Sequence, residues 1–283
     1  MEPTSIKSYL EELSTTADRI LLLQGPIGTF FSDFADWLHQ QCGKTVFKLN
    51  FNAGDELCFP ATKPNTFAYT DTFQAFPDFL SAFIREHRIE AVVCFGDTRP
   101  YHIAAKSVVH VLGNVSFWAF EEGYFRPYFV TLEKSGVNAY SPLPRDARFF
   151  ADAYPRLSRQ SYQDPAPVPA GFLPVAKQAI RYYVAARLHQ RRYPHYIHHR
   201  INHIGHYVKL WTLSGLKRVN YVLEDRHFAH QVKSGKYGKF FILPLQVFND
   251  SQIRVHSDFS SVRNFMLDRK STRLNSSHIT LSR

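Results

Sequence analysis

Short apolar runs alternate with segments of helical periodicity through the first half of the chain. The run that begins at Arg19 is followed by Phe31, Phe34, Ala35 and Leu38, which recur at the spacing of a helix. Runs of four to seven apolar residues between turns are typical of buried strands, and their alternation with helices predicts a doubly wound α/β domain with a parallel sheet. The predicted strands are 19–25, 45–51, 67–69, 91–94 and 115–119, and the predicted helices are 31–42, 76–84 and 103–112.

The second half of the chain has a different character. A proline-rich stretch at 158–174 predicts a linker or long surface loop. A basic region rich in His, Arg and Tyr follows at 175–213, and Pro194 should break its helix. The run 239–247 then predicts the first strand of a second α/β domain. We therefore expect a first domain at 1–157, a linker and basic helical region at 158–235, the start of a truncated second domain at 236–268, and a tail at 269–283.

The basic excess of the chain is partly carried by this tail. The formal net charge is +10, and residues 269–283 contain four basic residues and no acidic one, so without them it is +6. The tail shows no apolar periodicity, and we expect it to be a non-native addition. No helix-turn-helix, zinc-finger or RNA-binding pattern accompanies the charge, so nucleic acid is not expected as a partner. The absence of a leader, of an apolar run of about 18 residues, and of paired cysteines favours a cytoplasmic protein.

Charged and aromatic residues gather on two turns that follow predicted strands. Asp97, Arg99 and His102 follow the strand at 91–94, and the segment 120–127 follows the next. Ligands of open α/β sheets bind outside the carboxyl ends of the strands, so these turns should face one crevice. The second turn contains Glu121, Glu122 and Arg126.

Seven segments of the chain stand out as an ordered set of motifs. They are LQGP at 23–26, NFNAGD at 50–55, FGDTRPYH at 95–102, FEEGYFRP at 120–127, TLE at 131–133, GVN at 136–138 and PLQVFNDSQ at 244–252. Together they resemble the capsule polysaccharide biosynthesis and export proteins of the KpsS/LipB type, from about residue 19 to 266. The resemblance implies two Rossmann-like domains of a GT-B-like glycosyltransferase, the second incomplete here.

The resemblance also implies an activity and a setting. Such enzymes are retaining β-Kdo transferases of Gram-negative bacteria, which move Kdo, an acidic eight-carbon sugar, from CMP-Kdo to a phosphatidylglycerol-type lipid. The implied location is cytoplasmic and peripheral on the inner membrane, and the implied partners are an anionic lipid acceptor and the capsule assembly and export machinery. No cofactor beyond the donor is expected. No metal is expected, because CMP is already a good leaving group and no ligand spacing is present.

Carboxylates are the expected reactive groups, because Kdo transfer passes through an oxocarbenium-like state. Asp97 and Glu122 are the first candidates, and Glu121 could exchange roles with Glu122. Asp97 could instead cap a helix, and Glu122 could hold a loop through Arg99 or Arg126. The predicted substrate-binding residues are Gln24, Gly25, Asp55, Arg99, His102, Arg126, Gln246, Asn249, Asp250, Ser251 and Gln252.

Two questions stay open at this point: the role of the histidine-rich stretch, and whether the chain is an enzyme at all. The histidines at 195, 198, 199, 203 and 206 could form a solvated basic face, contact anionic lipid together with Trp211, or bind a metal. The whole chain could also be a non-catalytic glycan- or lipid-binding module of capsule export. Substitution of Glu122 or Asp97 would separate that module from an enzyme, because only an enzyme would lose turnover.

Overall fold

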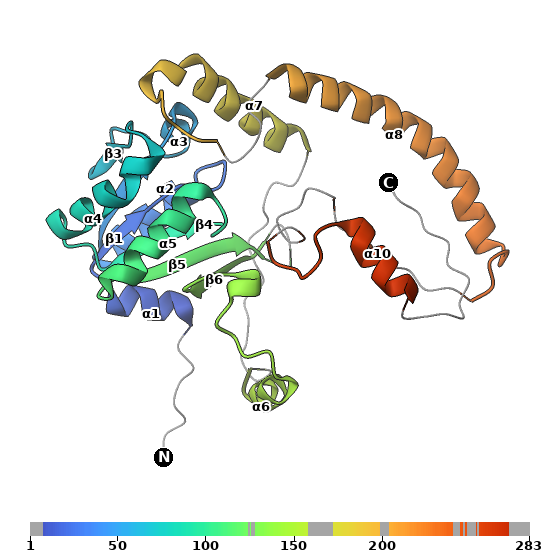
Figure 1. Ribbon diagram of the computed structural model, residues 1–283, viewed down its shortest axis with the longest axis horizontal. Helices are drawn as coiled ribbons and strands as arrows, with labels where there is room; N and C mark the ends of the chain where they lie inside the picture. The colour runs from blue at the N-terminus through green and yellow to red at the C-terminus, as the bar shows by residue number, and fades with distance from the viewer. Residues whose placement is uncertain are drawn as a thin grey trace. The chain divides into compact units, whose positions relative to one another are not determined.

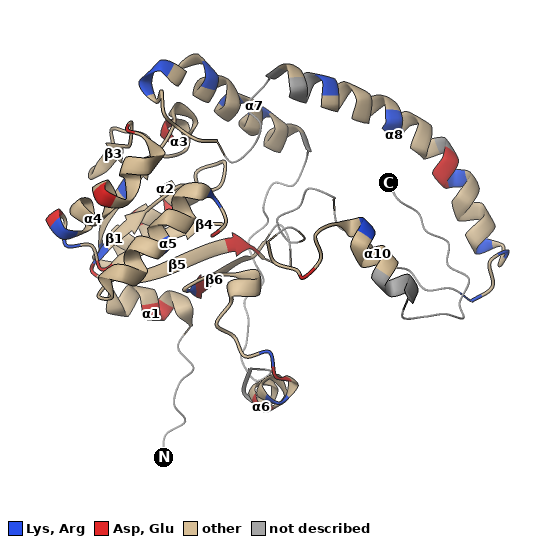
Figure 2. Cartoon of the chain, viewed as in Figure 1, with Lys and Arg blue, Asp and Glu red and all other residues tan. Residues whose placement is uncertain are grey.

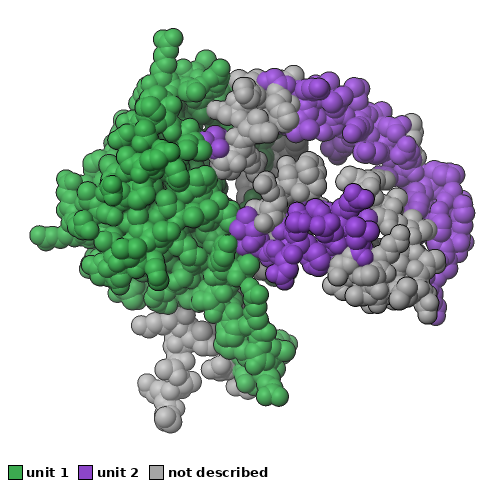
Figure 3. All heavy atoms as spheres, viewed as in Figure 1, with its two compact units in different colours: residues 1–197 green, residues 198–283 purple. Residues whose placement is uncertain are grey.

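The computed structural model describes residues 8–123, 125, 128–157, 172–198, 204–239, 244–245, 247, 253 and 255–271. By its internal contacts the chain divides into two units, residues 1–197 and 198–283 (Figure 3). Each unit is described by itself.

A six-stranded sheet forms the centre of the first unit (Figure 1). Its order is β3-β2-β1-β4-β5-β6, and the first five strands in this order pair in parallel. All five strands predicted from the apolar runs are therefore confirmed. The strands are β1 (Arg19–Leu22), β2 (Thr45–Asn50), β3 (Thr66–Ala68), β4 (Ala91–Phe95), β5 (Ser116–Glu122) and β6 (Val130–Lys134).

The sixth strand corrects the expectation of a wholly parallel sheet. β6 runs antiparallel to β5, with Val130 opposite Glu122 and Lys134 opposite Trp118. Most of its side chains are partly or fully exposed and only Glu133 is buried, so the apolar run that marks the other strands is missing. A short reversal after β5 is enough for an antiparallel neighbour, whereas a parallel one needs a crossover helix.

Capping residues set the end of α2 and the start of α3 in the first unit. Gly43 ends α2 in the left-handed conformation at φ 67°, which glycine adopts without strain. Asn52 begins α3 by accepting hydrogen bonds from the backbone N–H groups of Gly54 and Asp55. The helices are α1 (Tyr9–Thr16), α2 (Phe30–Cys42), α3 (Ala53–Cys58), α4 (Phe76–Glu86), α5 (Pro100–Leu112), α6 (Ala147–Leu157) and α7 (Phe172–Leu188), with short 3-10 turns η1 (Phe73–Ala75), η2 (Asn138–Tyr140) and η3 (Gln190–Arg192).

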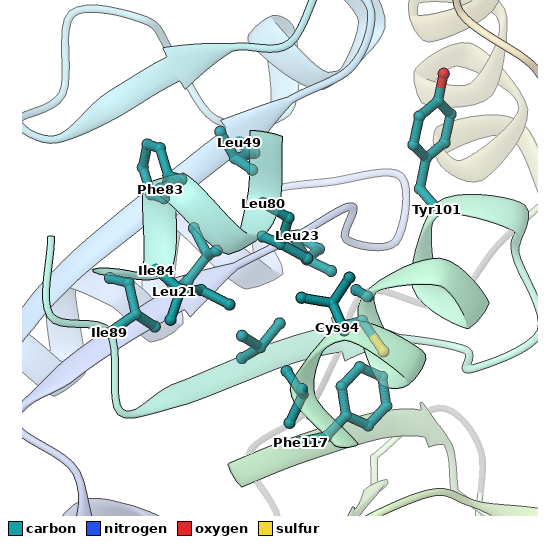
Figure 4. Packing of buried hydrophobic residues seen from close by; sticks show 14 of the residues in the cluster. Leu21, Leu23, Leu49, Leu80, Phe83, Ile84, Ile89, Cys94, Tyr101 and Phe117 are labelled. Carbon is teal, nitrogen blue, oxygen red and sulfur yellow. The ribbon is translucent and has the colours of Figure 1, made fainter. Parts of the chain in front are cut away.

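Two apolar clusters cover the two faces of the sheet. Leu21 and Leu49 pack with Leu80 of α4 and Val108 of α5 on one face (Figure 4). On the other face, Ile20, Leu22 and Trp118 pack with residues of α1 and α2. Successive residues of β1 thus enter opposite clusters, as expected for a strand buried on both sides.

α7 belongs to the first unit, although the sequence suggested a separate basic region. It packs against α3, and Tyr182 and Ala186, four residues apart, are its buried side chains. Lys and Arg are spread along this helix (Figure 2), and Leu173, Val175 and Leu188 are among its exposed apolar residues. Because these two residues lie about one helical turn apart, they share one face of α7, and this face anchors an otherwise largely exposed helix to α3.

The second unit contains two described helices, α8 (Ile204–Lys233) and α10 (Val262–Ser271). α10 confirms the helix expected after residue 261 and includes residues 269–271 of the predicted tail. The strand expected at 239–247 falls largely on residues 240–243 and 246, which lie outside the described part of the chain. Of the described helices, none combines enough length with enough apolar character to span a bilayer.

Candidate functional site

The sheet has a topological switch point between β1 and β4. The chain moves from β1 through β2 to β3 on one side, and from β4 to β5 on the other. The turns after β1 and β4 therefore leave the sheet side by side, which is where ligands of such sheets bind. Arg99 joins these turns, because its Nη1 donates to the carbonyl oxygen of Gly25 at 3.1 Å.

A buried polar cluster lies on the β1 and β2 side of this point. We call Gln24, Asn52, Asp55, Tyr182 and Tyr196 the tyrosine-capped cluster. Gln24 Nε2 donates to Asp55 Oδ1 at 3.1 Å and to the Tyr196 hydroxyl at 2.8 Å. The Tyr182 hydroxyl donates to Asp55 Oδ1 at 2.7 Å and accepts from Asn52 Nδ2 at 3.0 Å. The amide of Gln24 and the carboxylate of Asp55, both almost fully buried, thus satisfy each other together with two tyrosines.

Both tyrosines of this cluster are held in the neutral form, Tyr182 as a donor to Asp55 and Tyr196 as an acceptor from Gln24. Burial, followed by the nearby charge of Asp55, raises the pKa of Tyr182 well above its ordinary value. The same two causes raise the pKa of Tyr196. Tyr196 is also stacked on Tyr101 of α5, with ring centroids 5.9 Å apart. Tyr182 and Tyr196 therefore cover Gln24 and Asp55 and complete a structural hydrogen-bond network with them.

Contacts with α3 hold the segment that contains Tyr182 and Tyr196 in place over the cluster. Glu56 accepts two 2.9 Å hydrogen bonds from the guanidinium of Arg192 and one of 2.7 Å from the Tyr193 hydroxyl. Gly54 gives Tyr182 room to approach, because a Cβ at Gly54 would lie 2.7 Å from its ring. A residue with a side chain could not occupy that position without moving the ring.

One lysine is buried beneath the same turns. Lys48 of β2 is 2% exposed, its Nζ donates to the carbonyl oxygen of Leu49, and it lies near the ring of Phe59. Burial lowers its pKa to about 8, against a smaller raising effect of Asp55 and Cys58. Gly28 N donates to Cys58 Sγ at 3.2 Å, which ties the β1 turn to α3.

A second polar cluster lies at the carboxyl ends of β4 and β5. We call Asp97, Lys106, Glu121, Asn138 and Tyr140 the β5-end cluster. Asp97 is buried, and its Oδ2 accepts from the backbone N–H of Val137 at 3.1 Å. Asn138 Nδ2 donates to Glu121 Oε2 at 3.4 Å, a long hydrogen bond. Glu121 Oε2 also lies 4.0 Å from where a Cβ of Gly96 would stand, so the two carboxylates approach the same turn.

Strand alternation decides which of the two adjacent glutamates faces this cluster. Glu121 shares a face of β5 with Phe117 and Ala119, which pack against the α4 and α5 side. Glu122 points to the other face and is exposed. The structure therefore brings Glu121 to Asp97, and it leaves Glu122, the first candidate from sequence, on the opposite face.

The other predicted site residues are distributed as follows. Gly25 and Arg99 meet at the switch point, and Gln24 and Asp55 lie in the tyrosine-capped cluster. His102 is fully buried, and its Nδ1 lies at hydrogen-bonding distance from the carbonyl oxygen of Gly96, a contact that ties the first turn of α5 to the end of β4. Arg126, Gln246, Asn249, Asp250, Ser251 and Gln252 lie outside the described residues.

The histidine-rich stretch shows one contact that the sequence did not suggest. Tyr196 reaches into the tyrosine-capped cluster, while His199 and His203 lie outside the described residues. Within the described ranges no three His, Cys, Asp or Glu side chains are grouped as metal ligands would be.

Sequence reasoning missed the residues that surround its candidates. Asn52 follows a buried strand directly, and Lys48 is a charge inside a strand, so both carried a local signal. Asn138 belongs to the GVN segment at 136–138, but nothing in that segment indicated a contact with Glu121. Lys106 and Tyr182 carried no local signal, because only the fold brings them to the sites.

The chain matches known proteins over most of its length. Residues 90–274 match the family described as capsule polysaccharide biosynthesis protein. The chain is 57% identical over 267 residues to the capsule polysaccharide modification protein LipB of Neisseria meningitidis serogroup B, a match that covers 94% of this chain and 63% of the relative. It is 34% identical over 252 residues to the capsule polysaccharide export protein KpsS of Escherichia coli, covering 88% of this chain and 62% of the relative.

The chain thus spans less than two thirds of the length of these relatives. No solved structure matches it. The family match includes the turns that follow β4 and β5. The chain therefore belongs to the family of capsule polysaccharide biosynthesis proteins.

Proposed function

We propose that this protein is a retaining glycosyltransferase of capsule biosynthesis that moves Kdo from CMP-Kdo to a phosphatidylglycerol-type lipid. The observation that carries the proposal is the approach of Asp97 and Glu121 to the same turn beside the switch point. Membership of a capsule biosynthesis family supports the same reading. In the whole protein this site faces a second Rossmann-like domain of a GT-B-like enzyme.

The chemistry of transfer needs two carboxylates. One carboxylate oxygen attacks the anomeric carbon, and the bond to the CMP oxygen breaks with its electron pair leaving on CMP. The acceptor hydroxyl then attacks the same carbon, releases the carboxylate, and gives its proton to the second carboxylate. Two displacements retain the configuration. Asp97 and Glu121 supply these groups, and Glu122 is the lesser candidate.

Arg99 is suited to the phosphate of the donor. It stands between the β1 and β4 turns, and among the described residues its guanidinium donates a hydrogen bond to Gly25 O, so further N–H groups of the same guanidinium can bind an anion. The acceptor lipid is anionic, and the protein acts peripherally on the inner membrane with the capsule assembly and export machinery.

An in vitro transfer assay tests the proposal. CMP-Kdo is generated in situ, a fluorescent phosphatidylglycerol analogue is the acceptor, and mass spectrometry detects one added Kdo. The assay is run on this chain and on a chimera in which residues 1–268 continue into the remaining part of the meningococcal LipB. Addition of one Kdo by either protein supports the proposal, and failure of a folded chimera to add it contradicts it.

A binding module of capsule export is the second candidate, and one observation favours it. Asp97 is 3% exposed and accepts from Val137 N, as a carboxylate does when it only fixes a loop. In that case Asp97→Asn and Glu121→Gln would leave glycan and lipid binding unchanged, and no variant would show turnover to lose.

A further inference from the structure

We propose that Lys106 of α5, held over the ring of Tyr140, binds the carboxylate of the acidic sugar beside Asp97. This inference rests on the proposed function and names a specificity-determining residue of the same site. Neither the sequence motifs nor the family match singles out Lys106.

Lys106 of α5 contacts Tyr140 of η2, the turn that follows β6 in the chain. Its Nζ lies 4.6 Å from the ring centroid of Tyr140, within the range of a cation–π contact. Lys106 is only partly buried, and Tyr140 is about half exposed. In the part of the chain that the structure describes, Lys106 donates no hydrogen bond and forms no ion pair, so its three N–H donors remain for a ligand.

Gly136 brings the lysine and the carboxylate of Asp97 to one point. A Cβ at this glycine would lie 2.9 Å from Asp97 Oδ2 and 3.0 Å from Lys106 Nζ, with the Cβ of Tyr140 at 2.8 Å. Its φ of +153° is also one that residues with side chains rarely adopt. The bare backbone at Gly136 therefore leaves room for Lys106 Nζ and Asp97 Oδ2 to lie near the same point, beside the carboxylate that would meet the anomeric carbon.

The charges of the site require such a cation. The carboxylate of Kdo is bonded directly to its anomeric carbon, so a sugar placed for attack by Asp97 or Glu121 brings a third negative charge among them. Like charges at this range repel strongly in a partly desolvated site. A lysine beside Asp97 offsets this repulsion, and an ammonium on a flexible stem can follow the carboxylate as the carbon changes geometry.

Arg99 is less suited to this role. It lies at the switch point and donates to Gly25 on the β1 side, away from the loop that includes Gly136. We therefore assign the donor phosphate to Arg99 and the sugar carboxylate to Lys106. A neutral sugar of the same size would gain nothing from Lys106.

Direct binding of the free sugar tests the assignment without turnover. Isothermal titration measures the affinity of this chain for free Kdo and for Kdo methyl ester, in which the carboxylate is neutral. We expect Kdo to bind and the ester to bind at least ~10-fold more weakly, because a charge-assisted hydrogen bond is lost. Lys106→Met should weaken Kdo by a similar factor and leave the ester unchanged, and Lys106→Arg should restore part of the loss.

Lys134→Met is the matched control. Lys134 also lies over an aromatic ring, Trp118, at 5.4 Å, but it pairs with Glu12 at the other end of β5. Its removal should not change Kdo affinity. Equal affinity of the wild type and Lys106→Met for Kdo, equal affinity for acid and ester, or no binding of Kdo by the wild type would each overturn the inference.

Two further measurements separate this inference from the proposed function. CMP should bind equally to the wild type and to Lys106→Met, and a weaker CMP complex of the variant would assign Lys106 to the phosphate instead. If the LipB chimera transfers Kdo and its Lys106→Met form does so with unchanged KM, the inference fails and the function stands. If Kdo binds through Lys106 but the chimera transfers nothing, the function fails and Lys106 remains a sugar-acid site.

Discussion

The hydroxyl of Tyr182 lies 2.7 Å from Oδ1 of Asp55, although 127 positions separate the two residues in the chain. Through this contact a helix that looks like part of a basic linker closes over the carboxyl ends of β1 and β2. Among the described helices and strands, the main partner of α7 is α3, the helix that follows β2. The β5-end cluster is thus the better place for chemistry, and the tyrosine-capped cluster is the better place for stability.

Tyr182→Phe should destabilise the first unit. The change removes the hydroxyl and leaves buried hydrogen-bonding groups of Asp55 and Asn52 without it, which costs about 1–3 kcal/mol. Urea unfolding followed by tryptophan fluorescence measures the difference. Tyr154→Phe, on the exposed side chain of α6, is the control and should be neutral. Equal stability of the two variants would show that the cluster does not need Tyr182.

Lys48→Met should stabilise the protein at neutral pH. The pKa of Lys48 is about 8 in the folded protein and near 10.5 when it is unfolded. Below pH 8 the folded state therefore holds a buried charge, and between pH 8 and 10.5 the unfolded state binds more protons, so the free energy of unfolding contributed by this group rises with pH. We expect a gain on the order of 1–3 kcal/mol at pH 7, shrinking toward pH 10.

Urea unfolding at pH 7 and pH 9.5 measures this gain, with Lys134→Met as a partly exposed lysine for comparison. A gain that is the same at both pH values would contradict the linkage. A loss at pH 7 would show that the hydrogen bond from Lys48 Nζ to Leu49 outweighs the burial of the charge.

Glu56→Gln should loosen the segment that covers the tyrosine-capped cluster. The variant loses the paired contact with Arg192 and weakens the hydrogen bond from Tyr193. Because Arg192 is mostly exposed, we expect a cost of only about 1 kcal/mol. Hydrogen exchange should increase within α7 and residues 190–196 and stay unchanged in β1 and β4. Glu86→Gln, on the exposed end of α4, should change neither region.

Asp97→Asn and Glu121→Gln should each lower transfer by about 10²–10⁴-fold in the LipB chimera, whereas Glu122→Gln should have a small effect. The reason is the strand alternation that turns Glu121 toward Asp97 and Glu122 to the other face of β5. Turnover is measured by mass spectrometry of the lipid product, and circular dichroism checks folding. A larger loss in Glu122→Gln than in Glu121→Gln would reverse the assignment.

The elements of the central sheet could be predicted because each carries a local signal. β1, β4 and β5 contain continuous apolar runs, and the apolar run of β2 is interrupted by Lys48. Gly43 and Gly113 adopt the left-handed conformation that ends the helices before them. β6 could not be predicted, because Val130 is exposed, Thr131, Leu132 and Lys134 are only partly buried, and the pairing of the strand depends on its neighbour β5.

The site was predictable only at its centre. Asp97 and Arg99 follow β4, and Glu121 lies near the end of β5, so their place at the carboxyl edge followed from the alternation of strands and helices. Lys106 lies two turns into a helix, and Tyr182 lies on a helix beyond a proline-rich stretch. Their positions depend on how α5 and α7 pack, which no local pattern of the sequence expresses.

The close approach of Gly54 and Tyr182 has a consequence for the history of the family. A side chain at position 54 would displace the ring of Tyr182. A relative with such a side chain must therefore have a smaller residue at position 182, or lose the packing of α7 against α3. The two positions should therefore change together among homologous sequences. Relatives with glycine and an aromatic residue at this pair should share the covered form of the β1 and β2 edge, and relatives without them should have it open.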